Sequence, residues 1–71
     1  MDSQNMMVLR HLEDIGSLTA LEALEKYRIM RLSARINNLR KKGHDIKKIM
    51  VTETNPFGEQ KRFARYYLGR P

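Results

Sequence analysis

The sequence contains no cysteine and no tryptophan, only two histidines, and no long run of apolar residues. Without cysteine, neither a disulfide framework nor a cysteine-based zinc site can stabilise the chain. His11 and His44 lie far apart in the sequence, which argues against a histidine-based metal site, and we predict no metal. No apolar stretch approaches the roughly 18 residues of a membrane span, and the polar first residues do not resemble a signal peptide. We therefore expect a soluble intracellular protein without membrane contact.

Groups that carry catalysis are also scarce. The sequence has no nucleophile motif and no glycine-rich phosphate loop, and the adjacent acids Glu13 and Asp14 point to different parts of the helix surface without a second acid cluster that would indicate acid–base chemistry. We therefore predict that the protein is not an enzyme, and that it has no catalytic residues, no cofactor and no small-molecule ligand.

The 71 residues carry a net charge of +6, and the two signs are sorted along the chain. Residues 1–27 hold two cations and five anions, residues 28–50 eight cations and one anion, and residues 51–71 four cations and two anions. A run of charge can simply be a solvated surface, but a protein that needs only solubility has no reason to sort its signs. The basic middle third favours a polyanionic partner.

The first third of the chain predicts two helices. A helix over about residues 4–15 would bury an apolar stripe and end at Gly16, because glycine suits the left-handed residue after a helix. Thr19 and Glu22 have the spacing of a capping box, which predicts a second helix over about residues 20–27 after a brief extended segment. The expected core residues of these helices are Met6, Val8, Leu9, Leu12, Ile15, Leu21, Leu24 and Tyr27.

A third helix is predicted over about residues 30–42. Its apolar stripe has steps of three, four and three residues and consists of Ile29, Leu32, Ile36 and Leu39. Gly43 follows a last turn rich in cations, which suits the negative end of the helix dipole. We expect Arg40, on the flank of the core, to pair with an acid of an earlier helix, such as Glu13 or Glu25.

Beyond Gly43 the pattern becomes extended. The segments "IKKIMVTET" and "KRFARYYL" enclose the turn-rich "NPFGEQ", which predicts a β-hairpin over about residues 46–68. The whole chain, residues 1–71, thus forms a single α+β domain, a three-helix bundle followed by a two-stranded hairpin. Two helices joined by a short turn, the second one basic, are typical of a helix-turn-helix, and the hairpin would be its wing.

The third helix carries side chains that can recognise base edges and bind phosphates of DNA. At 100° per residue, one stripe lies about 100° from the apolar one and an outward face adjoins it. Arginine pairs with guanine, asparagine with adenine, alanine leaves room for a thymine methyl, and lysine holds phosphates. The stripe consists of Arg31, Arg35, Asn38 and Lys42, and the outward face of Ala34, Asn37 and Lys41. Lys61 and Arg62 would contact DNA from the wing.

Three motifs carry a resemblance over nearly the whole chain: "GSLTALEAL" (residues 16–24), "IMRLSARINNLRKKG" (residues 29–43) and "RFARYYL" (residues 62–68). They resemble the small helix-turn-helix proteins common in phages and prophages, of the winged-helix class that includes the DNA-binding domain of the biotin repressor. The resemblance implies binding of double-stranded DNA, with Arg31, Ser33, Arg35 and Asn38 as groove contacts. The chain departs from the usual pattern at the turn, where Arg28 stands at a position that glycine or asparagine often fills.

The expected function is therefore that of a small phage or prophage transcriptional regulator in the cytoplasm of a bacterial cell or phage-infected host. Two alternatives stay open. One is a protein-interaction module of the same fold that binds an acidic partner. The other is an excisionase-like architectural DNA binder. Self-association as a dimer would enlarge the small contact area of one domain, although no dimerisation helix is visible in the sequence.

Overall fold

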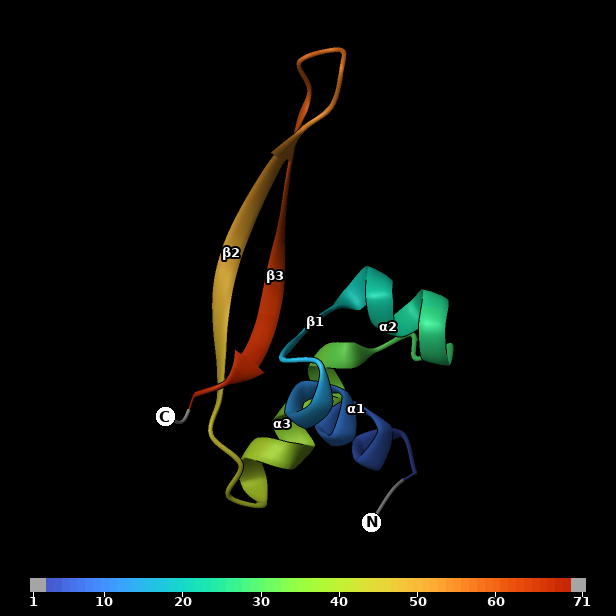
Figure 1. Ribbon diagram of the computed structural model, residues 1–71, viewed down its shortest axis with the longest axis vertical. Helices are drawn as coiled ribbons and strands as arrows, with labels where there is room; N and C mark the ends of the chain where they lie inside the picture. Colours follow the sequence, from blue (N-terminus) through green and yellow to red (C-terminus); the bar gives the residue numbers. More distant parts are fainter. Residues whose placement is uncertain (1–2, 70–71) are drawn as a thin grey trace.

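A small helical body and a long β-ribbon make up the protein (Figure 1). The computed structural model describes residues 3–69. Its elements follow in the order α1 (Ser3–Asp14), β1 (Ser17–Thr19), α2 (Ala20–Tyr27), α3 (Leu32–Lys41), β2 (Ile46–Thr54) and β3 (Gln60–Leu68). Figure 1 shows the three helices to one side of and below the lower half of the β2–β3 ribbon, whose upper half extends beyond them. This arrangement is the predicted α+β architecture.

The sheet has three strands rather than the two of the predicted hairpin. It is antiparallel with the order β1-β3-β2, because the short strand β1 pairs with the end of β3, from Ser17 opposite Tyr67 to Thr19 opposite Arg65. The long pairing of β2 with β3 runs from Ile46 opposite Leu68 to Thr54 opposite Gln60. β2 therefore forms an outer edge of the sheet, and only the base of the ribbon is held by β1.

The core lies between the helices and the base of the sheet. Its buried apolar residues are Val8, Leu12, Leu18, Ala23, Ile29, Leu32, Ile36, Leu39 and Ile46. The predicted apolar stripe from Ile29 to Leu39 is buried at all four of its positions, as the helical period requires. Truncating a residue of this stripe, such as Leu39, to alanine would remove about 2–5 kcal/mol of stability.

The predicted inner face of α1 is partly wrong. Met6 and Ile15 are 57% and 67% exposed, whereas Asn5 and His11 are buried beside Val8 and Leu12. The face of α1 that packs into the core is thus rotated by about one residue from the predicted face. The burial of His11 is possible because the ring has partners inside: its Nδ1 lies 2.7 Å from the Tyr27 hydroxyl and its Nε2 lies 3.0 Å from a backbone carbonyl.

The predicted inner face of α2 is also partly wrong. Leu21 and Leu24 are exposed, and the small Ala23 is the fully buried residue, because a methyl group lets this two-turn helix approach the body closely. Its predicted start is confirmed by the capping box: Thr19 Oγ1 accepts a hydrogen bond from the Glu22 amide at 3.1 Å. The Thr19 amide in turn donates to Glu22 Oε1 at 3.0 Å.

Candidate nucleic-acid interface

The turn between α2 and α3 depends on an unusual backbone conformation at Arg28. This residue has φ 58° and ψ 30°, in the left-handed region, and it is the one residue other than glycine with positive φ among residues 3–69. Its amide donates to the Leu24 carbonyl at 3.0 Å, and the Ile29 amide donates to the Ala23 carbonyl at 3.2 Å. Arg28 therefore adopts the conformation that glycine or asparagine often supplies in such turns.

The helix α3 is shorter than predicted at its start. It begins at Leu32, and Arg31 is its N-cap with φ −128° and ψ 71° and without a side-chain capping bond. The apolar period could not reveal this, because the buried Ile29 stands three positions before Leu32 whether the segment is a turn or a helix. Lys42 is the C-cap at the other end. Of the polar stripe that was predicted to contact DNA, only Arg35 and Asn38 thus lie within the helix, and Arg31 and Lys42 lie at its two caps.

The flank of α3 that carries Arg35 is turned toward α1. The Arg35 side chain is half-buried, and its Nη1 donates to Gln4 Oε1 of α1 at 3.5 Å. Asn38 is also half-buried. Arg35 therefore borders the seam between α1 and α3, and neither residue is fully exposed.

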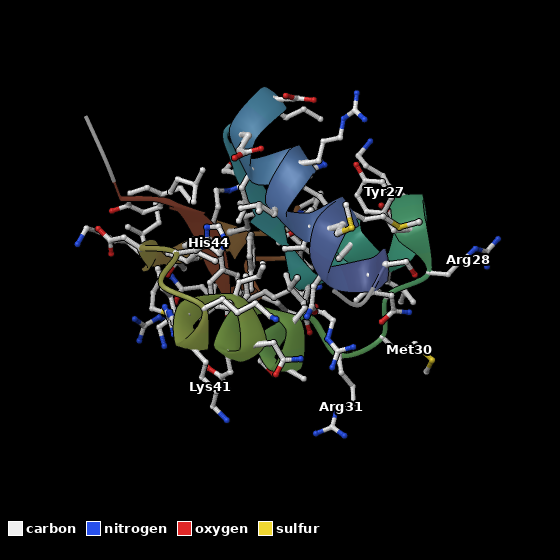
Figure 2. The ribbon with its side chains drawn as sticks, turned by 90° about the horizontal axis from the view of Figure 1, so that it is seen from below. Tyr27, Arg28, Met30, Arg31, Lys41 and His44 are labelled. Atoms are coloured by element: carbon white, nitrogen blue, oxygen red, sulfur yellow. The ribbon has the colours of Figure 1, made fainter. Side chains whose placement is uncertain are left out.

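The most exposed face of α3 lies away from α1. Ser33, Asn37 and Lys41 are exposed there, and Ala34 between them is half-buried. Figure 2 shows Lys41 and Arg31 projecting to the same side of α3, away from the helical body. The structure thus brings together the predicted outward face and Arg31, near opposite ends of one polar helix surface.

Arg40 does not pair with an acid of α1 or α2, contrary to the expectation from the sequence. Its Nε and Nη2 donate to the Ile46 carbonyl at 3.0 and 2.8 Å. The side chain therefore fastens the end of α3 to the first residue of β2. No pattern of residues indicated this bond, because a carbonyl acceptor can belong to any residue.

The two predicted wing contacts do not share a face of the ribbon. Lys61 stands opposite Glu53 and Arg62 opposite Thr52, and neighbouring residues of a strand point to opposite faces. By the same alternation, Arg62 and Lys48 share the face of Ile46, whose side chain is buried in the core. The exposed Lys48 was not among the predicted site residues, although its even spacing from Ile46 could have suggested this placement.

The side chain of Asn55 stabilises the turn at the tip of the wing through hydrogen bonds. Asn55 Oδ1 accepts hydrogen bonds from the amides of Phe57 and Glu59, both at 2.9 Å. Asn55 Nδ2 donates to Glu59 Oε1 at 2.7 Å, and the Gly58 amide donates to the Asn55 carbonyl at 3.0 Å. Gly58 has φ 83°, a conformation that glycine adopts without strain.

A comparison with protein-family models agrees with this architecture. The model of the winged helix-turn-helix domain matches residues 3–71. The chain belongs to this family. No curated protein matches the chain. Membership indicates DNA binding in general for this winged helix, and proteins of the family are typically not enzymes. Within residues 3–69, no helix combines the length and apolar character that crossing a membrane requires.

Beside α3, the winged helix also has a groove between α2 and the ribbon. Its volume is about 750 Å³, and its apolar wall includes Leu21, Leu24, Met30 and Phe63. Arg65 also lines it, and its Nη1 lies 3.0 Å from Ser17 Oγ and 3.4 Å from Glu22 Oε1. The groove thus lies next to the start of α3, and three of the predicted site residues, Arg31, Ser33 and Lys61, also line it.

Proposed function

We propose that this winged helix is a small transcriptional regulator of phage or prophage origin that binds double-stranded DNA with α3 in the major groove. One observation carries the proposal: the polar face of α3 from Ser33 to Lys41 is exposed on the side away from α1, with Arg31 projecting beside it (Figure 2). A helix fits the major groove of B-DNA, and its outward side chains reach base edges there.

The residues of this face divide into two kinds of contact. Asn37 has the donor and acceptor needed for adenine, Ser33 can bond to either base type, and Ala34 leaves room for a thymine methyl. Arg31 would pair with a guanine at the start of the helix. Lys41 and Lys42, at its end, would bind phosphates and fix the orientation of the helix on the duplex.

The flank toward α1 has a lesser role in this proposal. Arg35 lies within hydrogen-bond distance of Gln4, so we assign it a phosphate of the strand that passes over α1. Asn38, half-buried beside it, contacts only the edge of the site. This assignment differs from the sequence-based one, in which both residues read bases.

The wing would hold the backbone that flanks the groove. Arg62 and Lys48 project from the face that also carries the buried Ile46, and we assign them contacts to the backbone on that side of the ribbon. Lys61 projects from the other face, opposite Glu53, where it lines the groove beside α2 together with Arg31 and Ser33, and we assign it a contact to the backbone next to the start of α3.

Selection from a random duplex library, followed by anisotropy titration with the recovered duplex, tests the proposal. The double variant Arg31→Ala, Lys41→Ala should weaken binding strongly at low salt. Each lost phosphate contact should reduce the slope of log K against log salt by about 0.9. A recovered palindrome would also indicate a dimer with two half-sites. Unchanged affinity for the duplex in the double variant would contradict the assignment of α3.

Arg10 supplies a matched control. It is an exposed cation on α1, paired with Asp14 at 3.3 Å, and it stands two positions from the buried Val8, on the far side of α1 from the core. Arg10→Ala removes one positive charge, so it is compared with the single variants Arg31→Ala and Lys41→Ala, titrated beside the double variant. It should leave affinity and salt slope nearly unchanged if binding depends on α3, and it should weaken binding equally if only net charge matters.

A protein partner is the second candidate function. The groove beside α2 favours it, because Leu21, Leu24 and Met30 are exposed large apolar residues. An acidic protein could contact these residues together with the cations of α3. Competition separates the two functions: duplex DNA should displace a bound acidic protein poorly if the protein is the true partner. If the library enriches no duplex sequence, binding of a protein partner becomes the favoured function.

A further inference from the structure

Phe57 is the most exposed large apolar residue of the described chain, with 88% of its surface open to solvent. It stands in the turn between β2, which ends at Thr54, and β3, which begins at Gln60, and Figure 1 shows this turn at the end of the ribbon away from the helices. An aromatic side chain left in water at this position contributes nothing to the core. Its placement therefore points to a ligand of the wing tip.

The tip presents this ring in a fixed way. The Phe57 amide donates to Asn55 Oδ1 at 2.9 Å, and the Glu59 amide donates to the same oxygen at 2.9 Å. Pro56 precedes Phe57, and its ring fixes its own φ near −65°. Because the backbone on both sides of Phe57 is already ordered, binding through the ring loses little conformational entropy.

The tip carries no cation that could bind a phosphate. Residues 54–60 contain no lysine and no arginine, and the one carboxylate among them, Glu59, accepts a hydrogen bond from Asn55 Nδ2 at 2.7 Å. Lys61 is the first cation along β3, and Glu53 stands opposite it. The benzyl group of Phe57 is therefore the main group that the tip can offer to a ligand.

The ribbon is long enough to reach a neighbouring groove. β1 pairing ends where Thr19 meets Arg65, and Arg65 is opposite Ile49. From Ile49 to the end of β2 at Thr54 the strand rises about 17 Å at ~3.4 Å per residue. Adjacent major and minor grooves of B-DNA are separated by about half a helical turn, roughly 17 Å. The part of the ribbon beyond β1 thus spans about the distance that separates a major groove from the adjacent minor groove.

We propose that Phe57 is an apolar wedge that enters this minor groove, inserts between two stacked base pairs and kinks the duplex. Apolar side chains on minor-groove binders act in this way, and the resulting bend brings more DNA against the protein. Pyrimidine–purine steps unstack most easily, so the wedge also contributes sequence preference at a position that α3 does not touch. The inference rests on the proposed DNA binding and adds bending to it.

Duplexes carrying 2-aminopurine test the wedge, because this base fluoresces more strongly when it is unstacked. The probe is placed at each position of the duplex recovered by selection, and the full chain is added at saturating concentration. The unchanged protein should raise fluorescence at one step, about half a turn from the α3 contacts, and should bend the DNA in a permuted-site mobility assay. Phe57→Ala should abolish both signals and lower affinity about tenfold.

Two further variants make the test specific. Phe57→Leu keeps an apolar wedge and should retain most of the fluorescence and the bend. Lys61→Ala should reduce the salt slope, whereas Phe57→Ala should leave that slope unchanged, because a wedge releases no counterions. Thermal melts followed by circular dichroism should be the same for all these variants, since both side chains are exposed.

The outcomes separate the wedge from DNA binding itself. If the unchanged protein binds the duplex without fluorescence change or bend, and Phe57→Ala binds equally well, the wedge is overturned while the proposed function stands. If no duplex binds at all, the proposed function fails and the wedge fails with it. If Phe57→Ala changes only the sedimentation of the protein, the ring contacts another protein chain and the wedge is likewise overturned.

Discussion

Replacing Arg28 by glycine should stabilise the protein. Arg28 has φ 58°, where a residue with a Cβ is disfavoured by about 1–2 kcal/mol relative to the right-handed conformation. Glycine avoids this penalty, but it loses more conformational freedom on folding, which costs about 0.5–1 kcal/mol. The Arg28 side chain points away from the body (Figure 2), so its removal leaves no cavity. We expect a net gain of about 0.5–1 kcal/mol.

For a domain of this size, that gain corresponds to a rise in melting temperature of about 2–8 °C. Thermal unfolding followed by circular dichroism measures it directly, and urea denaturation gives the free energy of unfolding. Asparagine is tolerated in the left-handed region, so R28N should leave stability near that of the unchanged protein or raise it slightly. R28V should destabilise by more than about 1 kcal/mol, because β-branched residues are strongly disfavoured there.

A comparison of two Arg28 variants, R28A and R28G, also tests whether Arg28 binds DNA. R28A removes the charge but keeps a Cβ in the left-handed conformation, whereas R28G removes both. If Arg28 contacts a phosphate, both variants should reduce the salt slope by about 0.9 although their stabilities differ. A lower melting temperature for R28G than for the unchanged protein would refute the reasoning, since it would mean that the turn does not carry backbone strain that glycine can relieve.

Two other hydrogen-bonded positions give sharp predictions for stability. Tyr27→Phe removes the hydroxyl 2.7 Å from His11 Nδ1 and leaves that buried nitrogen without its partner, so urea denaturation should show a loss of about 1–3 kcal/mol; an unchanged midpoint would mean that the bond contributes nothing. Thr19→Ala removes the acceptor for the Glu22 amide and should lower stability by about 1 kcal/mol. Thr19→Ser should restore most of that loss, and equal losses in both variants would place the effect in β1 rather than in the cap.

The third helix was the most predictable part of the fold. Its four apolar residues repeat at helical spacing, and all four are buried. With charged residues on the other side of the helix, only the apolar side can pack against the core. The limits of the helix were less predictable. Arg31 and Lys42 lie at its caps, and their positions depend on the turn at Arg28, whose left-handed conformation comes from the closure of the chain between two packed helices.

The core of α1 could not be predicted from apolar period alone. His11 is buried because Tyr27 and the Ser17 carbonyl, both outside α1, supply its hydrogen bonds. The same limit applies to the candidate site. That Arg35 turns toward Gln4 depends on how α1 crosses α3, whereas the opposite faces of Lys61 and Arg62 follow from strand alternation alone.

The exposed edge of β2 has a consequence for solubility. An edge strand offers unpaired backbone groups to any other strand, and lysines along it discourage such pairing. β2 carries Lys47 and Lys48, exposed on the two faces of this edge, next to the half-exposed apolar residues Ile49 and Met50. The cations that could attract a nucleic acid therefore also keep one ribbon from joining another. A variant in which both lysines are replaced by neutral residues should therefore show aggregation as its first defect, ahead of its weaker DNA binding.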